Sequence, residues 1–189
     1  AVSFDAILKR TKANYVLGLT ATPIRRDGQQ PIIFMQCGPI RYTAAKPASA
    51  PHDLEVLPRS CCNRIDLPND ARIQDVFRHL AKDQARIEAI ATEVRNAFDK
   101  GRKVLVLTER TEHLDGITAA LEGLEPAPFV LHGRMSRKQR AALVADLDKL
   151  PPDLPRILLA TGKLVGEGFD HPPLDTLVLA MPVSWKGTL

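Results

Sequence analysis

The chain has 189 residues, of which 44% are hydrophobic and 25% are charged, and its formal net charge is +4. This composition is typical of a globular protein with a packed core, and no apolar stretch approaches the roughly 18 residues that a membrane helix needs. The three cysteines, Cys37, Cys61 and Cys62, show no C-x-x-C spacing, which argues against a disulfide framework or a zinc site. We therefore expect a cytoplasmic protein with reduced thiols and no membrane partner. The small basic excess is compatible with a nucleic-acid partner but does not require one.

The N-terminal third of the sequence predicts no regular architecture. A short helix begins at Ser3, and "YVLGLT" (15–20) predicts a buried strand that ends at Pro23. The turn "RRDGQQP" follows, and residues 32–43 predict one or two short strands around Gly38. Residues 44–53 are rich in Ala, Pro and Ser and predict a linker, after which residues 54–68 predict an extended, partly paired segment.

From residue 69 onward, helical and strand patterns alternate. Apolar residues at spacings of three, four and seven predict one or two amphipathic helices that end at Gly101, a C-terminal cap. Further strands are predicted at 103–108, 128–133, 156–161 and 174–181, and helices at 111–124 and 136–150. Ser136 and Gln139 have capping-box spacing. This alternation predicts an α/β fold with a parallel sheet and helices on both faces.

In such a sheet, ligands gather at the carboxyl ends of the strands, so the loops after residues 108, 131, 161 and 181 are of interest. The loop in "ILLATGKLVGEGFD" (157–170) resembles a phosphate cradle because it contains Gly162-Lys163. A P-loop would need Gly at position 157 and Ser or Thr at position 164, where the chain has Ile157 and Leu164. The glycines of this loop therefore need another explanation.

Three stretches at strand ends together carry a resemblance to a known family. They are "LTATP" (19–23), "LTERTEHLDGI" (107–117) with "LHGRMSRKQR" (131–140), and "ATGKLVGEGFDHPPLDTLVLAMP" (160–182). In this order they resemble motifs III, IV with IVa, and V of superfamily-2 helicases, nearest to the DEAD/DEAH-like and restriction-type translocases. The resemblance implies a RecA-like second motor domain, preceded by the end of a first motor domain. It also implies ATP-driven movement along a nucleic acid.

The resemblance assigns a role in ATP binding to Glu167, Gly168 and Asp170, with Asp170 accepting from a ribose hydroxyl and Gly168 near the γ-phosphate. The alternative is a tight turn that Asp170 caps. Thr20, Ala21 and Thr22 correspond to motif III, which couples hydrolysis to the grip on nucleic acid. The alternative is that both hydroxyls only satisfy backbone groups at a strand end.

The nucleic-acid contacts implied by the resemblance fall on three strand ends. They involve hydroxyls, backbone N–H groups and one arginine, which bind phosphate oxygens without reading sequence, and the residues are Thr108, Arg110, His132, Gly133, Thr161 and Gly162. For Arg110 the alternative is a solvated surface arginine, and for His132 it is a side chain that shapes the turn.

The sequence departs from the family at both ends. It has no P-loop, no Asp-Glu pair before "LTATP" and no Q-x-x-G-R-x-x-R after motif V. We therefore expect a fragment with the end of the first motor domain at 1–43, a linker at 44–68 and a truncated second motor domain at 69–189. Such a fragment, taken alone, should be inactive and bind no cofactor, whereas its parent should use ATP and Mg and bind nucleic acid, with DNA favoured over RNA. The first motor domain of the same chain would then be a missing partner.

Two other functions fit the same residues. One is an ATP-independent module of helicase-like fold that binds nucleic acid or a protein. The other is the motor part of a restriction nuclease.

Overall fold

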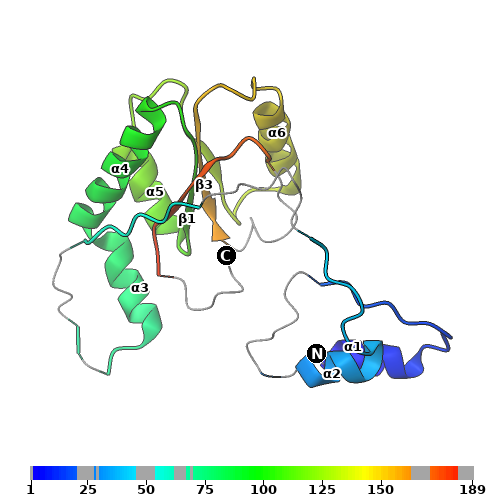
Figure 1. Cartoon of the computed structure of the whole chain (residues 1–189). Helices are drawn as coiled ribbons and strands as arrows, with labels where there is room; N and C mark the ends of the chain where they lie inside the picture. Colours follow the sequence, from blue (N-terminus) through cyan, green and yellow to red (C-terminus); the bar gives the residue numbers. More distant parts are fainter. Residues whose placement is uncertain are drawn as a thin grey trace. The chain divides into compact units, whose positions relative to one another are not determined.

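The computed structural model describes residues 2–20, 28, 30–45, 54–61, 67–68, 70–162 and 171–182. The chain forms two compact units, one from residues 1–58 with 184–189 and one from residues 59–183 (Figure 1). The domain boundaries predicted from sequence stay predictions, because they rest on a comparison with two-domain motors and not on contacts within this chain. Among the described residues, no helix is long and apolar enough to cross a membrane.

The first unit contains two short helices, α1 (Val2–Arg10) and α2 (Gln30–Cys37). They are joined by a hydrogen bond from Gln36 Nε2 to Asp5 Oδ1 of 2.7 Å. Within α1, Lys9 Nζ lies 2.8 Å from the other oxygen of the Asp5 carboxylate. The helix predicted near Ser3 is confirmed, although it begins at Val2.

The strand predicted at 15–20 is wrong for this structure. Residues 15–20 form no helix or strand, and the side chains of Tyr15, Leu17 and Leu19 are 93%, 82% and 85% exposed. A strand needs neighbouring strands to satisfy its backbone groups, and the described residues of this unit contain none. The apolar pattern is therefore present without the sheet that would bury it.

The strands predicted within 32–43 are also wrong, because residues 32–37 lie in α2 and residues 38–43 form no strand. A short continuous apolar run such as "PIIFMQC" fits a buried strand and a helix equally well by periodicity. Pro31 is compatible with the helix because it lies in the first turn, where its missing N–H costs no hydrogen bond. Gly38, with φ +79°, donates its N–H to the carbonyl of Phe34 (2.9 Å) and ends the helix. In the segment predicted to be extended and partly paired, the described residues 54–61 and 67–68 form no strand.

In the second unit, the amphipathic region forms two helices, α3 (Ile73–Lys82) and α4 (Gln84–Asp99). Asp83 separates them, because its side chain accepts from the N–H of Arg86 at 3.2 Å and caps α4. At the other end of α4, Gly101 has φ +79° and its N–H bonds to the Phe98 carbonyl, while the next N–H reaches the Ala97 carbonyl. This is a Schellman cap, which confirms the predicted helix end.

A four-stranded parallel sheet forms the centre of the second unit, with strand order β2-β3-β1-β4. Strands β1 (Lys103–Thr108) and β3 (Arg156–Thr161) have the predicted bounds, whereas β2 (Phe129–Leu131) and β4 (Thr176–Leu179) are shorter than predicted. Helix α5 (Thr111–Ala120) ends before the predicted position, and α6 (Arg137–Asp148) starts at the predicted capping box of Ser136 and Gln139. The α/β fold with a parallel sheet is therefore confirmed.

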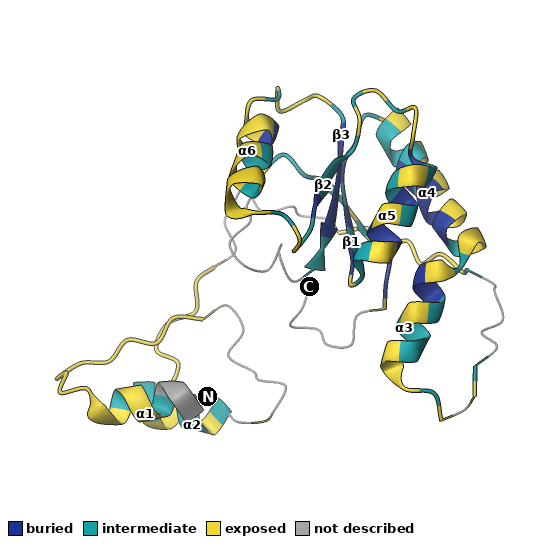
Figure 2. Ribbon diagram, turned by 180° about the vertical axis from the view of Figure 1, so that it is seen from behind, coloured by how far each residue is buried: buried dark blue, intermediate teal, exposed yellow. Residues whose placement is uncertain are grey.

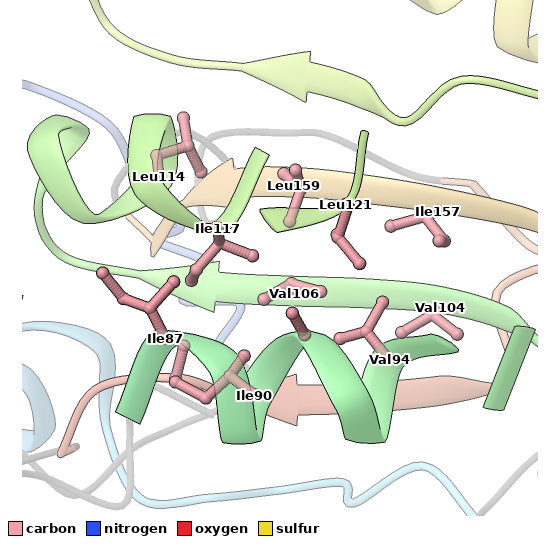
Figure 3. Close-up of a cluster of buried hydrophobic side chains, with 12 residues drawn as sticks. Ile87, Ile90, Val94, Val104, Val106, Leu114, Ile117, Leu121, Ile157 and Leu159 are labelled. Carbon is pink, nitrogen blue, oxygen red and sulfur yellow. The ribbon is translucent and has the colours of Figure 1, made fainter. Parts of the chain in front are cut away.

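Helices cover both faces of this sheet, as the buried residues in Figure 2 show. On one face, α4 and α5 pack on β1 and β3 through fully apolar side chains (Figure 3), which include Val94, Val104, Val106, Leu114, Ile117 and Leu159. On the other face, α6 packs through Leu147 on Leu131, Leu158 and Ala160. This core holds the four strands in place. Because the strands are parallel, the loops that follow them lie at one edge of the sheet.

Candidate functional site

The carboxyl edge of the sheet brings together most of the described residues predicted to contact nucleic acid. Thr108 ends β1 and is paired in register with Thr161, which ends β3. On the other side of β3, Leu131 of β2 pairs with Ala160. His132 and Gly133 therefore come directly after β2, at the same edge of the sheet. Neighbouring strand ends therefore carry the predicted residues, as a parallel sheet requires.

Thr108 lies in the interior and not on the surface of this edge. It is 2% exposed, and its Oγ1 lies 2.9 Å from Nδ1 of His113, a residue of α5 that is itself fully buried. The backbone N–H of Arg110 also points to this Oγ1, at 3.5 Å. The hydroxyl therefore supports the β1–α5 connection, and this burial does not favour a direct contact of Thr108 with phosphate.

His113 was not singled out from the sequence, although it lies five residues after Thr108. Burial, together with the smaller effect of the positive charge of Arg86, lowers the pKa of His113 to about 4. The ring is therefore neutral near pH 7. Its Nε2 is buried with no hydrogen-bond partner in the described part of the chain. Arg86 in turn donates to the carbonyl of Ala180 at 2.9 Å, just after β4.

Arg110 is held at the N-terminus of α5 by contacts with α3. Its terminal nitrogen donates to the backbone carbonyl of Gln74 (3.0 Å) and to Gln74 Oε1 (2.9 Å). A shallow depression of about 520 Å³ surrounds this pair, lined by Gln74, Phe77, Glu109, Arg110, Thr111 and Glu112. Two carboxylates and one guanidinium border it, so the depression itself is not a basic surface. The guanidinium is not simply a solvated surface group, since it ties two helices together.

Thr161 and Gly162 lie beside Glu109, a residue that sequence reasoning missed. A Cβ atom placed on Gly162 would lie 3.1 Å from Oε1 of Glu109, so the carboxylate rests against the backbone of the loop. Thr161 is half-buried, unlike its register partner Thr108. Of the two threonines, Thr161 is therefore the one whose hydroxyl can meet a ligand at this edge. Glu109 directly follows Thr108 at the end of β1, and this position at a strand end is the sequence signal that could have found it.

His132 and Gly133 form the turn that follows β2. The carbonyl of His132 accepts from the N–H of Met135 at 3.1 Å, and the Nδ1 atom of its ring is buried without a partner among the described residues. A Cβ on Gly133 would meet no atom within 4 Å, so space does not require glycine there. These contacts favour a role of His132 in shaping the turn.

The remaining predicted residues cannot be placed together with this edge. The predicted ATP-binding residues Glu167, Gly168 and Asp170 lie outside the described residues, as do Ala21 and Thr22 of the predicted coupling motif. Thr20 is exposed and belongs to the first unit. Within the described ranges, no group of three His, Cys, Asp or Glu side chains could hold a metal ion.

The parallel four-stranded sheet with helices on both faces, and with the candidate residues at its carboxyl edge, is an α/β fold of the kind that the sequence predicted. No protein-family model matches the chain. Over 193 residues the chain is 22% identical to a putative ATP-dependent RNA helicase of Acanthamoeba polyphaga mimivirus, a match that covers 96% of this chain and 36% of that protein. The chain thus spans about a third of the curated relative. This similarity to an ATP-dependent helicase agrees with the helicase resemblance that the sequence motifs carry.

Two solved structures are similar to parts of the chain. T4 UvsW aligns with a TM-score of 0.48 and 16% identity, and the alignment covers 61% of this chain and 23% of that one. The C-terminal part of the Fun30 ATPase domain aligns with a TM-score of 0.43 and 21% identity, covering 62% of this chain and 35% of that one.

Proposed function

We propose that this chain is part of an ATP-dependent nucleic-acid helicase or translocase, in which residues 69–189 act as the second motor domain. This domain would grip the nucleic-acid backbone and close the ATP cleft. The observation that carries the proposal is the position of Thr161 and Gly162 at the carboxyl edge of a parallel sheet, within the stretch that resembles motif V. A hydroxyl beside a glycine backbone suits the binding of phosphate oxygens. The helicase similarity along nearly the whole chain supports the same conclusion.

The nucleotide part of the proposal concerns residues that resemble the ATP side of motif V. Asp170 would accept a hydrogen bond from the ribose, Gly168 would approach the γ-phosphate, and Glu167 would support both. Thr20, Ala21 and Thr22 would couple hydrolysis to the grip on nucleic acid. Magnesium and the P-loop would come from a first motor domain, so the 189-residue chain alone should turn over no ATP.

The exposed apolar run of the first unit supports a covering first motor domain. Large side chains at Tyr15, Leu17 and Leu19 face solvent, and solvent exposure of such a run marks an interaction surface. We propose that a sheet of the first motor domain covers it in the parent protein. Large apolar side chains at every second residue, Tyr15, Leu17 and Leu19, suit strand addition.

The test compares the 189-residue chain with the protein encoded by its complete gene. We expect the chain alone to show no ATP turnover, and the complete protein to hydrolyse ATP faster when nucleic acid is added. In the complete protein, Asp170→Ala should raise the KM for ATP by about fivefold to tenfold, because a hydrogen bond worth about 1 kcal/mol or more is lost. A complete protein that binds nucleic acid without hydrolysing ATP would overturn the motor proposal and favour the passive binding module. Nucleic-acid cleavage that needs ATP would favour the restriction nuclease.

The kind of nucleic acid and the location of the protein remain proposals. We propose DNA over RNA as the partner, although the mimivirus relative is named an RNA helicase. Contacts to phosphate alone do not distinguish the two, whereas contacts to the 2′-hydroxyl do. Competition between single-stranded DNA and RNA of the same sequence decides this point, since tighter binding of RNA would reverse the preference. A cytoplasmic location stays a prediction from the cysteine pattern.

A further inference from the structure

A buried cation lies on the α6 face of the sheet, away from the carboxyl edge. Arg156, the first residue of β3, is 0% exposed, although its guanidinium is charged. Burial lowers the pKa of this guanidinium, which reflects the cost of removing the charge from water. A side chain of this kind persists only if its N–H groups find partners. The contacts of Arg156 therefore decide what this site requires.

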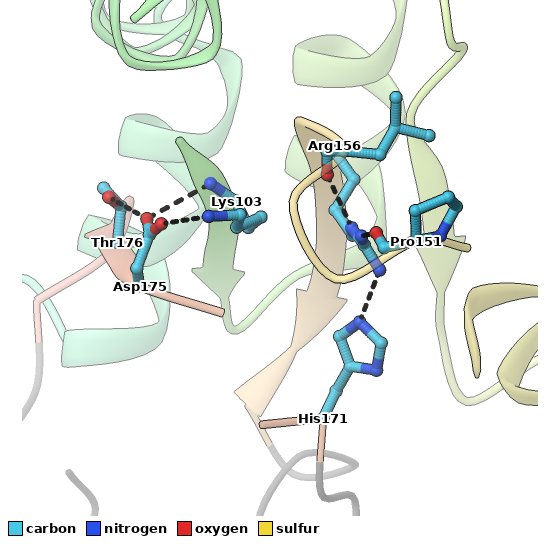
Figure 4. A network of polar contacts seen from close by, with 7 residues as sticks. Lys103, Pro151, Arg156, His171, Asp175 and Thr176 are labelled. Atoms are coloured by element: carbon cyan, nitrogen blue, oxygen red, sulfur yellow. Dashed lines mark hydrogen bonds and ion pairs between the residues drawn. The ribbon is translucent and has the colours of Figure 1, made fainter. Parts of the chain in front are cut away.

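Each nitrogen of the Arg156 guanidinium has a partner (Figure 4). The Nε–H donates to the carbonyl of Leu154 (3.0 Å), and one terminal nitrogen donates to the carbonyl of Pro151. The other terminal nitrogen lies 3.1 Å from Nε2 of His171. Two of the three partners are carbonyl oxygens, and the third is a ring nitrogen of an imidazole. His171, which is also buried, is the only one of them that can exist in more than one protonation state.

The contact with Arg156 fixes the protonation of the imidazole. A guanidinium has only donors, so Nε2 of His171 must carry a lone pair and the ring proton must lie on Nδ1. That atom lies 3.3 Å from Oδ1 of Asp148 at the end of α6. Asp148, His171 and Arg156 therefore form a chain of hydrogen bonds. In this chain Nδ1–H of His171 donates to the Asp148 carboxylate, and Nε2 accepts from the Arg156 guanidinium. A proton on Nε2 would face a guanidinium hydrogen.

His171 is also the first residue of a short segment, residues 171–175, that hydrogen bonds hold at two points. The carbonyl of His171 accepts from the N–H of Leu174 (3.1 Å), and Leu174 packs on the core beneath α6. Four residues after His171, Asp175 accepts from both the backbone N–H and Nζ of Lys103, each at 3.1 Å, and from Thr176 Oγ1 at 2.8 Å. Figure 4 shows the bonds of Asp175 to Lys103 and Thr176 and, separately, the contact of His171 with Arg156. Residues 171–175 thus form a fixed lead into β4.

We propose that His171 is a positioning residue, held as the Nδ1–H tautomer between Arg156 and Asp148, that fixes the lead into β4 at the position next in sequence to the stretch that resembles the nucleotide side of motif V. This inference rests on the proposed function for its consequence, because Asp170 directly precedes His171 in the sequence. The tautomer and the anchor themselves are properties of this chain without any ligand. A histidine that served only to fill space could adopt either tautomer and would not need its two ring nitrogens to face Arg156 and Asp148.

The first test reads the tautomer directly in the 189-residue chain. Ring nitrogen chemical shifts of ¹⁵N-labelled protein distinguish Nδ1–H from Nε2–H. We expect His171 to be the Nδ1–H tautomer, and Arg156→Met to shift it toward Nε2–H because the guanidinium donor is gone. His79, half-buried on α3, serves as an internal reference that Arg156→Met leaves unchanged. A wild-type Nε2–H tautomer, or an Nδ1–H tautomer unaffected by Arg156→Met, would overturn the proposal.

The second test separates the two contacts of the ring. In His171→Gln the amide oxygen can take the place of Nε2 and still accept from Arg156, whereas in His171→Asn the amide reaches only the position of Nδ1. Hydrogen exchange at the amides of Leu174 and Asp175 reports the lead into β4. We expect His171→Asn to speed this exchange by about tenfold or more and His171→Gln by less than about threefold. His79→Asn is the matched control and should change neither amide.

Equal exchange in His171→Asn and His171→Gln would overturn the positioning role. The consequence for function is tested separately in the complete protein, where His171→Asn should raise the KM for ATP more than it lowers kcat. An anchored His171 with unchanged ATP kinetics would overturn the link to nucleotide binding. A complete protein with no ATPase at all would overturn the proposed function and leave the tautomer and exchange results standing.

Discussion

Thr108 and Thr161 are register partners at the carboxyl ends of β1 and β3, but only Thr161 is partly open to solvent. The hydroxyl of Thr108 is turned to His113 in the interior. Two threonines that look alike in the sequence, each at the end of an apolar run, thus have different surroundings. The difference arises because His113 of α5, the helix that follows β1, lies against the hydroxyl of Thr108. Thr161 is followed by Gly162, which has no side chain that could cover it.

We expect Thr161→Ala in the complete protein to weaken nucleic-acid binding by about 1 kcal/mol, roughly fivefold, because one hydrogen bond to a phosphate oxygen is lost. Fluorescence anisotropy with two oligonucleotides of different sequence measures the change. The loss should be equal for both, since backbone contacts carry no sequence information. Thr118→Ala is the control, because its hydroxyl donates to the Leu114 carbonyl within α5. A loss confined to one sequence would contradict the assignment of Thr161.

The buried His113 predicts a loss of stability in mild acid. Its folded-state pKa is about 4, below the ordinary value of 6.5, so the unfolded chain takes up the proton first as the pH falls. Its contribution is complete above pH 6.5 and is lost progressively between about pH 6.5 and 4, by up to about 3 kcal/mol. Urea unfolding at pH 7, 5.5 and 4 measures this loss.

The matched variants are His113→Leu and His79→Leu. The first removes the titrating ring and should flatten the stability curve in this pH range, although its stability at pH 7 is lower because Thr108 loses a partner. His79→Leu should leave the pH dependence of the free energy of unfolding as it is in the wild-type protein. An unchanged slope in His113→Leu would show that other groups cause the acid sensitivity.

The apolar face beneath α4 and α5 should be sensitive to cavities. Leu159 is fully buried between these helices and the sheet, so Leu159→Ala should lower the free energy of unfolding by about 3 kcal/mol. Leu177 on β4 is about half exposed, and Leu177→Ala should cost less than about 1 kcal/mol. Urea denaturation of both variants tests this, and equal losses would mean that the two faces of the sheet are misassigned.

Asp175 predicts a second, more acidic transition. Burial raises the pKa of its carboxyl, but hydrogen bonds from Thr176 and Lys103 outweigh that effect and hold the pKa below its usual value. A lowered carboxyl pKa means that the contribution is present at neutral pH and is lost as the pH falls through the folded-state pKa. Asp175→Asn should therefore cost about 1 kcal/mol at pH 7 and progressively less at strongly acidic pH. Asp153→Asn, at an exposed turn, should change little at either pH.

Local patterns predicted the second unit better than the first. The bounds of β1 and β3 follow from short apolar runs between turn signals, and the start of α6 follows from Ser136 and Gln139. The stretch 15–20 has the same local pattern as these strands but no neighbouring strand in the described unit to pair with. Strand formation depends on partners that are distant in sequence, so a propensity alone could not decide it.

The candidate site was predictable where it depends on strand ends. Thr161 and Gly162 lie where a parallel sheet places them, beside Thr108. The burial of Thr108, the approach of Glu109 to Gly162 and the contact between Arg156 and His171 depend on how helices and loops cover the sheet. No spacing in the sequence encodes these contacts, because each joins residues through the tertiary packing of different elements.

The strand order of the sheet has a consequence for how the second unit assembles. Strand β1 has no hydrogen bonds to β2, the next strand in the chain, and pairs instead with β3 and β4. During synthesis, residues 103–108 therefore leave the ribosome with both edges open and must wait for residues 156–161 before any strand can pair. Sheets built from such distant pairings fold slowly and expose unpaired edges meanwhile. Truncations that end between β2 and β3 should thus depend on chaperones far more than the chain that reaches β4.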